Sequence, residues 1–253
     1  MGMYRAETTD RYRLRVATTA SDICAAQELR HKAFHGKDGR PQGAHLRDED
    51  AFDTTCTHFL IEHARTGELV ATLRVLLLGS GADIGESYSA QFYDLDAFRS
   101  FEAPMAEVGR FCVAPGTADP DILRMAWGAL TTYVDKNGVE MLFGCSSFSG
   151  TDESVYADAF AMLRDKYLAP RRFWPKVKAP NVFRFASRLR RAPDKTRALK
   201  TMPPLLRSYL TMGGWVSDHA VVDREMNTLH VFTGLEIGRI PPSRARILRA
   251  ALG

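Results

Sequence analysis

Met-Ala-Glu-Val-Gly-Arg-Phe-Cys-Val, residues 105–113, is the stretch that decides the fold. Its apolar composition is typical of a β-strand, and Pro115 closes it. Two charged residues, Glu107 and Arg110, lie within it. Side chains three apart on a strand point to opposite faces unless a bulge intervenes. The stretch therefore predicts a strand that carries a carboxylate and a guanidinium.

The residues that follow this stretch predict a helix and a second strand, which complete a strand–helix–strand unit. Asp119 and Pro120 supply an N-cap and a first-turn proline for a helix that ends near Gly138. Val139 to Ser147 resumes as an apolar strand, and a further helix is expected from Glu153 to Tyr167.

The N-terminal part predicts a strand, a helix and a hairpin. Tyr12 to Thr18 alternates as a strand does, and Thr19, Ser21 or Asp22 can cap the helix that follows. The apolar face of this helix is expected to consist of Ile23, Ala26, Leu29 and Ala33. After a polar loop over residues 36–53, the runs Thr57 to His63 and Leu69 to Leu78 predict an antiparallel hairpin.

The C-terminal part predicts two further strands beyond a proline-rich stretch. An insertion of short helices and loops is expected over about residues 168–212. Trp215 to Val222 and Thr228 to Leu235 then close the sheet. The expected fold class is α+β, with a central mixed sheet flanked by helices, formed by a single domain over residues 1–253.

Composition limits the function classes. The chain of 253 residues is 45% hydrophobic and 25% charged, which is ordinary for a globular protein. We expect no membrane span, because no apolar run approaches the roughly 20 residues that a spanning helix needs. Residues 1–15 show no apolar core of a signal peptide, so a cytoplasmic location is expected. The four widely spaced cysteines predict neither a disulfide nor a metal site.

Positive charge is concentrated in the predicted insertion. Twelve basic residues and one acidic residue lie between Arg171 and Arg207, so this segment has a net charge of +11. The whole chain has a net charge of +4, so the remaining residues sum to 4 − 11 = −7. An acidic partner is implied. Nucleic acid is disfavoured as this partner, because prolines space the basic residues and no nucleic-acid-binding motif is present.

Separated motifs resemble a known enzyme family. Residues 107–113, residues 141–148 (MLFGCSSF) and residues 213–223 (GGWVSDHAVVD), taken in this order, are similar to the ornithine N-acyltransferases of bacterial ornithine-lipid biosynthesis. The resemblance extends from about Leu29 to Leu235. It implies a GNAT-like acyltransferase fold, whose central strand offers backbone amides to a thioester carbonyl.

A more distant resemblance is to the acyl-homoserine-lactone synthases. It implies substrate-binding roles for Arg30, Phe34, Asp50, Asp53 and Arg74, and catalytic roles for Glu107 and Arg110. The tryptophan that those synthases carry between the phenylalanine and the aspartate pair has no counterpart in residues 35–49, which argues against lactone synthesis.

The resemblance also bears on the acyl donor. Acyltransferases of the GNAT fold that use coenzyme A bind its diphosphate at a glycine-rich loop before a helix. Residues 114–121 (APGTADPD) carry two aspartates at that place, which would repel a diphosphate. We therefore expect no bound cofactor, and a donor that is the acyl-phosphopantetheine of an acyl carrier protein. Its acidic surface suits docking residues in the basic segment, Arg171, Arg172, Lys176 and Lys178.

The expected chemistry is aminolysis of a thioester. Glu107 is the expected general base, and the alternative is a structural ion pair between Glu107 and Arg110. The carboxylates of Asp50 and Asp53 are expected to bind the side-chain ammonium of ornithine, although a solvated turn is an equally good interpretation. Thioester and acyl binding is assigned to Phe111, Cys112, Val113, Ser146 and Ser147.

Other functions stay open at this point. Lysine, glutamine or glycine could replace ornithine as the acceptor. A non-catalytic module that binds anionic lipid is the alternative from another class, and peripheral membrane contact could also accompany catalysis.

Overall fold

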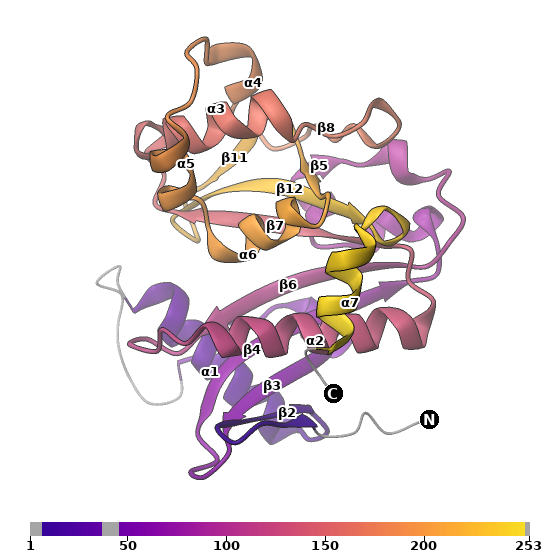
Figure 1. The fold of residues 1–253 in the computed structure, drawn as a ribbon, viewed down its shortest axis with the longest axis vertical. Helices are drawn as coiled ribbons and strands as arrows, with labels where there is room; N and C mark the ends of the chain where they lie inside the picture. The colour runs from indigo at the N-terminus through magenta and orange to yellow at the C-terminus, as the bar shows by residue number, and fades with distance from the viewer. Residues whose placement is uncertain (1–6, 37–45, 251–253) are drawn as a thin grey trace. The chain divides into compact units, whose positions relative to one another are not determined.

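The computed structural model describes residues 7–36 and 46–250, and these form two compact units (Figure 1). The first unit contains the chain up to Leu77, residues 108–137 and the C-terminal residues from Ala245. The second contains residues 78–107 and 138–244. Strand β6 (Met105–Val113) contributes to both, because the boundary falls after Glu107. The prediction of a single domain over residues 1–253 stays a prediction.

The first unit contains a sheet in the order β1-β2-β3-β4-β6. Its strands are β1 (Glu7–Thr8), β2 (Tyr12–Val16), β3 (Thr57–His63), β4 (Leu69–Leu78) and the later part of β6. β3 and β4 pair as the antiparallel hairpin that the sequence predicts, and β2 pairs antiparallel with β3. β4 is buried along almost its whole length, so its polar member Arg74 needs a partner inside the protein.

Helix α1 (Ala20–His35) begins at a capping box. The Thr19 hydroxyl accepts from the Asp22 amide, and the Asp22 carboxylate accepts in turn from the Thr19 amide. The predicted apolar face is partly wrong, because Ile23 and Ala33 are only half-buried. The buried positions are Ala26, Gln27, Leu29, Arg30 and His35. The helix therefore turns polar side chains inward, and these take part in the network described below.

Helix α2 (Pro120–Asn137) follows β6 and packs on β2 and β3. Its buried face repeats at three- and four-residue intervals, as an amphipathic helix requires: Ile122, Met125, Ala126, Ala129, Leu130, Tyr133 and Val134. The predicted start and end of this helix are confirmed.

The second unit contains a sheet in the order β6-β7-β12-β11-β9. β7 (Met141–Ser149) pairs parallel with β6 over residues 105–107, and antiparallel with β12 (Thr228–Glu236) along its whole length. β11 (Ala220–Asp223) and β9 (Val182–Phe183) continue the sheet, and β10 (Trp215–Val216) pairs with β12. The predicted return of the C-terminal strands to the sheet is confirmed.

Trp215 to Val222 does not form the single strand that the sequence predicts. The Ser217 hydroxyl donates to the His219 carbonyl and accepts from the Phe232 amide, so a side chain takes the place of the regular ladder. The Trp215 ring lies against Gly234, where a Cβ atom would meet the ring at 2.3 Å. Glycine is thus required there by packing.

Short helices cover this second sheet. A 3-10 turn η5 (Glu153–Tyr156) precedes α3 (Ala157–Lys166), so the predicted helix over this region is regular only in its second part. α4 (Phe185–Arg188), α5 (Lys195–Thr201) and α6 (Pro204–Thr211) lie in the basic segment, as expected of a proline-rich stretch. The C-terminal helix α7 (Pro242–Ala250) belongs to the first unit from Ala245 on. Phe148, Phe160 and Phe185 form the buried centre under α3.

The connection between β4 and β6, residues 79–104, has no counterpart in the sequence prediction. It contains η2 (Gly81–Glu86), η3 (Ser89–Gln91), β5 (Tyr93–Asp94) and η4 (Asp96–Phe98). β5 pairs with β8 (Lys176–Val177), which follows the turn η6 (Arg171–Phe173). The start of the basic segment is thereby fastened to this connection.

Candidate active site

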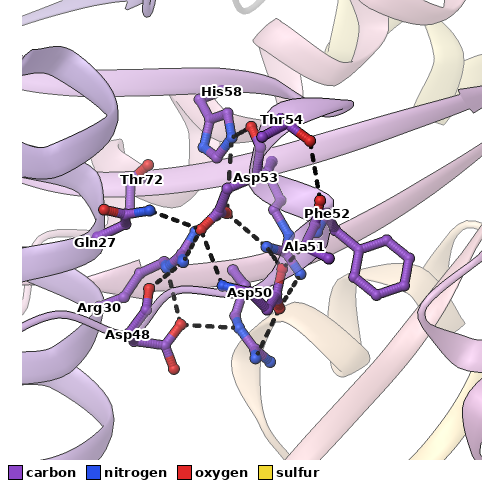
Figure 2. A network of polar contacts seen from close by, with 12 residues as sticks. Gln27, Arg30, Asp48, Asp50, Ala51, Phe52, Asp53, Thr54, His58 and Thr72 are labelled. Carbon is purple, nitrogen blue, oxygen red and sulfur yellow. Dashed lines mark hydrogen bonds and ion pairs between the residues drawn. The ribbon is translucent and has the colours of Figure 1, made fainter. Parts of the chain in front are cut away.

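A buried ion network lies in the first unit around Asp53, in the turn η1 (Ala51–Thr54) (Figure 2). The Asp53 carboxylate accepts from Arg30 Nη1 at 2.7 Å and Nη2 at 2.8 Å, and from Gln27 Nε2 at 2.9 Å. The Arg30 side chain is 1% exposed, and its Nε lies 3.0 Å from Asp48 Oδ1. Figure 2 shows Gln27 and Arg30 pointing from α1 toward Asp53. Helix α1 and the loop are therefore held together by charge.

Arg74 connects strand β4 to the same loop. Its Nη1 donates to Asp53 Oδ1 and to Asp50 Oδ1, both at 2.6 Å, and its Nη2 donates to Asp50 Oδ2 at 2.7 Å. Carboxylates of this loop therefore hold the Arg74 guanidinium, and its predicted role in substrate binding stays a prediction. Asp53 thus accepts from two arginines, and both are almost completely buried.

Arg110 adds a third guanidinium from strand β6. Its Nε donates to Asp48 Oδ1 and its Nη2 to Asp50 Oδ2, both at 3.1 Å. The backbone of Arg110 has φ = 52°, a left-handed conformation that non-glycine residues adopt only at a cost of about 1–3 kcal/mol. A β-bulge between Glu107 and Arg110, which was considered from the sequence, would require a local irregularity of this kind. Three arginines and three aspartates balance each other, so the network is neutral in charge.

The network favours the ionised forms of Asp50 and Asp53. Burial alone would raise the pKa of Asp53, but the bonds from Arg30 and Gln27 and the charge of Arg30 outweigh burial and hold the pKa well below its usual range. The same balance lowers the pKa of Asp50, where Arg74 and Arg110 oppose burial. Asp50 has the more exposed side chain of the two, at 22% against 5%.

Glu107 is buried in the second unit, on the first part of β6. Its Oε2 accepts from the Tyr88 amide at 2.8 Å. Its Oε1 accepts from the Ser89 amide at 2.7 Å and from the Ser89 hydroxyl at 2.5 Å. Hydrogen bonds from these donors favour the ionised form of the carboxylate, which is the form that a general base requires.

The residues predicted to bind the acyl group are divided between the units. In the first unit, Cys112 is buried, and burial raises the pKa of its thiol to about 12, so the thiol stays protonated. Phe111 and Val113 are half-buried. In the second unit, Ser146 is buried and accepts from the Thr233 hydroxyl at 2.9 Å, whereas Ser147 is exposed. Their roles stay predictions.

Phe34 lies half-buried near the end of α1, and its predicted role in substrate binding also stays a prediction. Phe143 and Phe148, which flank the predicted acyl-binding Ser146 and Ser147 in the sequence, are fully buried. They pack against Phe232 and Phe160 respectively. Both are core residues of the second unit.

The four predicted docking residues lie in and next to η6 and β8. Arg171 is exposed, and Arg172, also exposed, forms an ion pair with Glu236. Lys176 lies 3.9 Å from Asp94. Lys178 Nζ donates to the Ala90 carbonyl at 2.5 Å, one residue after Ser89. Lys176 and Lys178 are therefore joined to the connection between β4 and β6, whose Tyr88 and Ser89 amides hold Glu107.

The N-terminus of α2 is filled by side chains of the protein itself. The Asp119 carboxylate accepts from the Asp121 amide at 3.0 Å and from the Tyr12 hydroxyl at 2.8 Å. Arg11 forms ion pairs with both aspartates. These bonds hold the pKa of Asp119 below its usual range, so a negative charge stands where a diphosphate would need free amides.

Several residues of the site could not be found in the sequence. Gln27 and His58 both form hydrogen bonds to Asp53. Asp48 pairs with Arg30 and Arg110, although only Asp50 and Asp53 were selected from the acidic residues of this loop on the basis of the sequence. Ser89 lies in a polar run that carries no periodic signal. Its contact with Glu107 becomes visible only in the structure.

Other kinds of site were searched for in the described ranges. Residues 7–36 and 46–250 contain no group of three or more side chains that could hold a metal ion. No helix in these ranges is both long and apolar enough to cross a membrane. Within the described ranges, Cys24, Cys56, Cys112 and Cys145 form no disulfide.

Comparison with known proteins identifies the family. Residues 29–128 match the acetyltransferase (GNAT) domain family. The chain is 34% identical over 229 residues to an L-ornithine N(alpha)-acyltransferase of Rhodobacter capsulatus, and the match covers 87% of this chain and 88% of that protein. The chain belongs to the L-ornithine N(alpha)-acyltransferase family. A member from Rhizobium meliloti is 30% identical, and the match covers 89% of this chain and 80% of that protein.

The GNAT-like fold predicted from the sequence is confirmed by the domain match. Among solved structures, the chain is similar to an N-acyl amino acid synthase from uncultured soil microbes, at 13% identity and a TM-score of 0.49. That comparison covers 91% of this chain and 93% of the synthase.

Proposed function

We propose that this protein transfers a 3-hydroxy fatty acyl group from acyl carrier protein to the α-amine of L-ornithine. The observation that carries the proposal is the identity of 34% to an L-ornithine N(alpha)-acyltransferase over nearly the whole of both chains. The product is an N-acylornithine, the lyso form of an ornithine lipid, and the second product is the free carrier protein.

Glu107 is the general base of this reaction. The neutral α-amine attacks the thioester carbonyl, a C–N bond forms, and the C–S bond breaks as the tetrahedral intermediate collapses. The nitrogen gives up a proton to Glu107, directly or through water, and this proton ends on the sulfur of the phosphopantetheine arm. No covalent enzyme intermediate is needed, in keeping with the high pKa of the Cys112 thiol.

Asp50 is the better candidate for binding the side-chain ammonium of ornithine. Both Asp50 and Asp53 were predicted for this role, but Asp53 already accepts from Arg30, Arg74 and Gln27. Asp50 also accepts from Arg74 and Arg110, but its side chain is 22% exposed against 5% for Asp53, so a ligand cation can reach it from solvent. Glutamine and glycine have no side-chain cation, so they would form no ion pair with Asp50.

Two observations support a carrier protein as the donor. The carboxylates at the start of α2 disfavour the diphosphate of coenzyme A, which the arm of a carrier protein lacks. The exposed cations Arg171 and Lys176 lie on the segment that pairs with β5 and contacts Ala90, so a protein docked there would lie beside the connection that holds Glu107. The charge of this segment matches the acidic surface of carrier proteins.

The test is a comparison of donors. We expect 3-hydroxyacyl carrier protein and ornithine to give N-acylornithine with a kcat/KM at least 100-fold above that with the matching acyl-coenzyme A. Equal efficiency with the two donors would contradict the choice of carrier protein, and failure with both would contradict the proposed function. We further propose a cytoplasmic location with peripheral contact to the inner membrane face, which flotation with anionic vesicles would test.

A further inference from the structure

Two of the three donors to Glu107 are backbone amides, and the third is the hydroxyl of Ser89. Ser89 is completely buried, and Glu107 is 5% exposed. Hydrogen bonds to an ionised acceptor in such surroundings are the strong ones in proteins. The hydroxyl is also the only one of these three donors that a change of side chain can remove.

The turn that carries Ser89 is fixed from within. The Ser87 hydroxyl donates to the Ile84 carbonyl at 2.7 Å and accepts from the Ala90 amide at 3.2 Å. Lys178 holds the Ala90 carbonyl from the basic segment. Several contacts hold this turn besides the bond of the Ser89 hydroxyl, so the turn does not depend on any single one of them, and the hydroxyl can orient the carboxylate.

The direction of the Ser89 hydroxyl follows from its neighbours. An ionised carboxylate only accepts, so the hydroxyl hydrogen points to Glu107 Oε1. The Ser89 oxygen then accepts from the thiol of Cys145, whose Sγ lies 3.4 Å away. A serine with its donor fixed in this way holds one carboxylate oxygen in place.

We propose that Ser89 is the positioning residue of the general base: its hydroxyl fixes Glu107 in the orientation in which the carboxylate takes the proton of the attacking amine. Ser89 acts through Glu107, so no bond of Ser89 forms or breaks during the reaction. The proposal rests on the proposed function, because it needs Glu107 to be the base. It assigns no contact between Ser89 and the substrate.

The test is a double-mutant cycle in the full-length protein. We expect S89A to lower kcat about 10-fold, with the KM for ornithine and for the acyl donor within twofold of the wild type. E107Q should lower kcat by about 100-fold, and the double variant should equal E107Q alone, since residues that act as one unit are not additive. A double variant at least fivefold slower than E107Q would overturn the proposal.

Ser87 supplies the matched control. It lies in the same turn and is equally buried, but its hydroxyl bonds stay inside the turn. S87A should reduce the melting temperature while keeping kcat within threefold of the wild type. If S87A lowers kcat as much as S89A does, the loss of kcat comes from disturbance of the turn and not from loss of the Ser89 hydroxyl, and the proposal is wrong.

A second variant, S89C, covers the case in which S89A does not fold. It keeps a weaker donor at the same place, so its kcat should lie between those of S89A and the wild type, or about three- to fivefold below the wild type. A kcat of S89C at the wild-type level would overturn the proposal. Wild-type kcat in E107Q would instead remove Glu107 as the base, and so contradict the proposed function separately.

Discussion

Replacing Asp53 by asparagine tests whether the ion network holds the first unit together. The substitution keeps the shape of the side chain but removes a charge that Arg30 and Arg74 share, and the side chains of these two arginines are 1% and 4% exposed. It also places an amide donor among groups that only donate. Two buried guanidinium groups would then lack part of their counter-charge.

The size of the effect follows from this burial. Removing one partner of a buried ion pair costs about 3–5 kcal/mol. For chains of about this length, 1 kcal/mol lowers the melting temperature by about 2–4 °C, so we expect D53N to melt about 6–20 °C below the wild type. Scanning calorimetry at pH 7 measures this difference directly.

Asp50 provides the comparison. Its side chain is 22% exposed, so water can take over part of its role, and D50N should melt no more than about 5 °C below the wild type. D50N should instead raise the KM for ornithine more than it lowers kcat, since binding of the ammonium changes little along the reaction. A D53N protein that melts within 2 °C of the wild type, or above D50N, would refute the reasoning.

Three further predictions concern the base, acid stability and the docking segment. E107Q should lower turnover about 100-fold, because it removes the proposed general base, and a stopped-flow assay would measure this. It should also lower the melting temperature in calorimetry, because the new amide nitrogen must face a backbone N–H donor. The pKa of Asp53 is held below its usual range, so its contribution to stability is complete above about pH 4 and is lost as the pH falls further. Calorimetry below pH 4 should therefore show the gap between wild type and D53N closing, and a widening gap would contradict this sign. R171E, alone or with R172E, should raise the donor KM at least fivefold, and added salt should weaken wild-type activity, whereas R65E in the exposed β3–β4 turn should change nothing. An equal effect of R65E would show that the charge of the chain as a whole, and not the segment, matters.

The regular elements could be predicted because each carries a local signal. β3, β4 and β6 have the bounds that their apolar runs predict, and α2 begins at the Asp119-Pro120 signal. The buried face of α1 was mispredicted because Gln27 and Arg30 point inward, and only their partners in the acidic loop make this favourable. The local pattern of apolar residues cannot show that a buried polar side chain has a partner elsewhere in the chain.

The connection from residue 79 to residue 104 could not be predicted for a related reason. It is built of 3-10 turns, which have no long periodic pattern, and contacts distant in the sequence fix their positions. Glu107 could be selected from the sequence as a charge in an apolar strand, but its partner Ser89 belongs to one of these turns. Glu107 could therefore be selected from the sequence, whereas the residues that hold it could not.

The most direct test of the proposed function is the choice of acceptor and of the amine that is acylated. Purified protein should be incubated with 3-hydroxyacyl carrier protein and, in turn, with ornithine, lysine, glutamine and glycine. Tandem mass spectrometry of the lipid extract then identifies each product and the acylated nitrogen. We expect ornithine to be the best acceptor by at least tenfold in kcat/KM, with the acyl group on the α-nitrogen. Preference for another amino acid, or acylation of the side-chain nitrogen, would contradict the account.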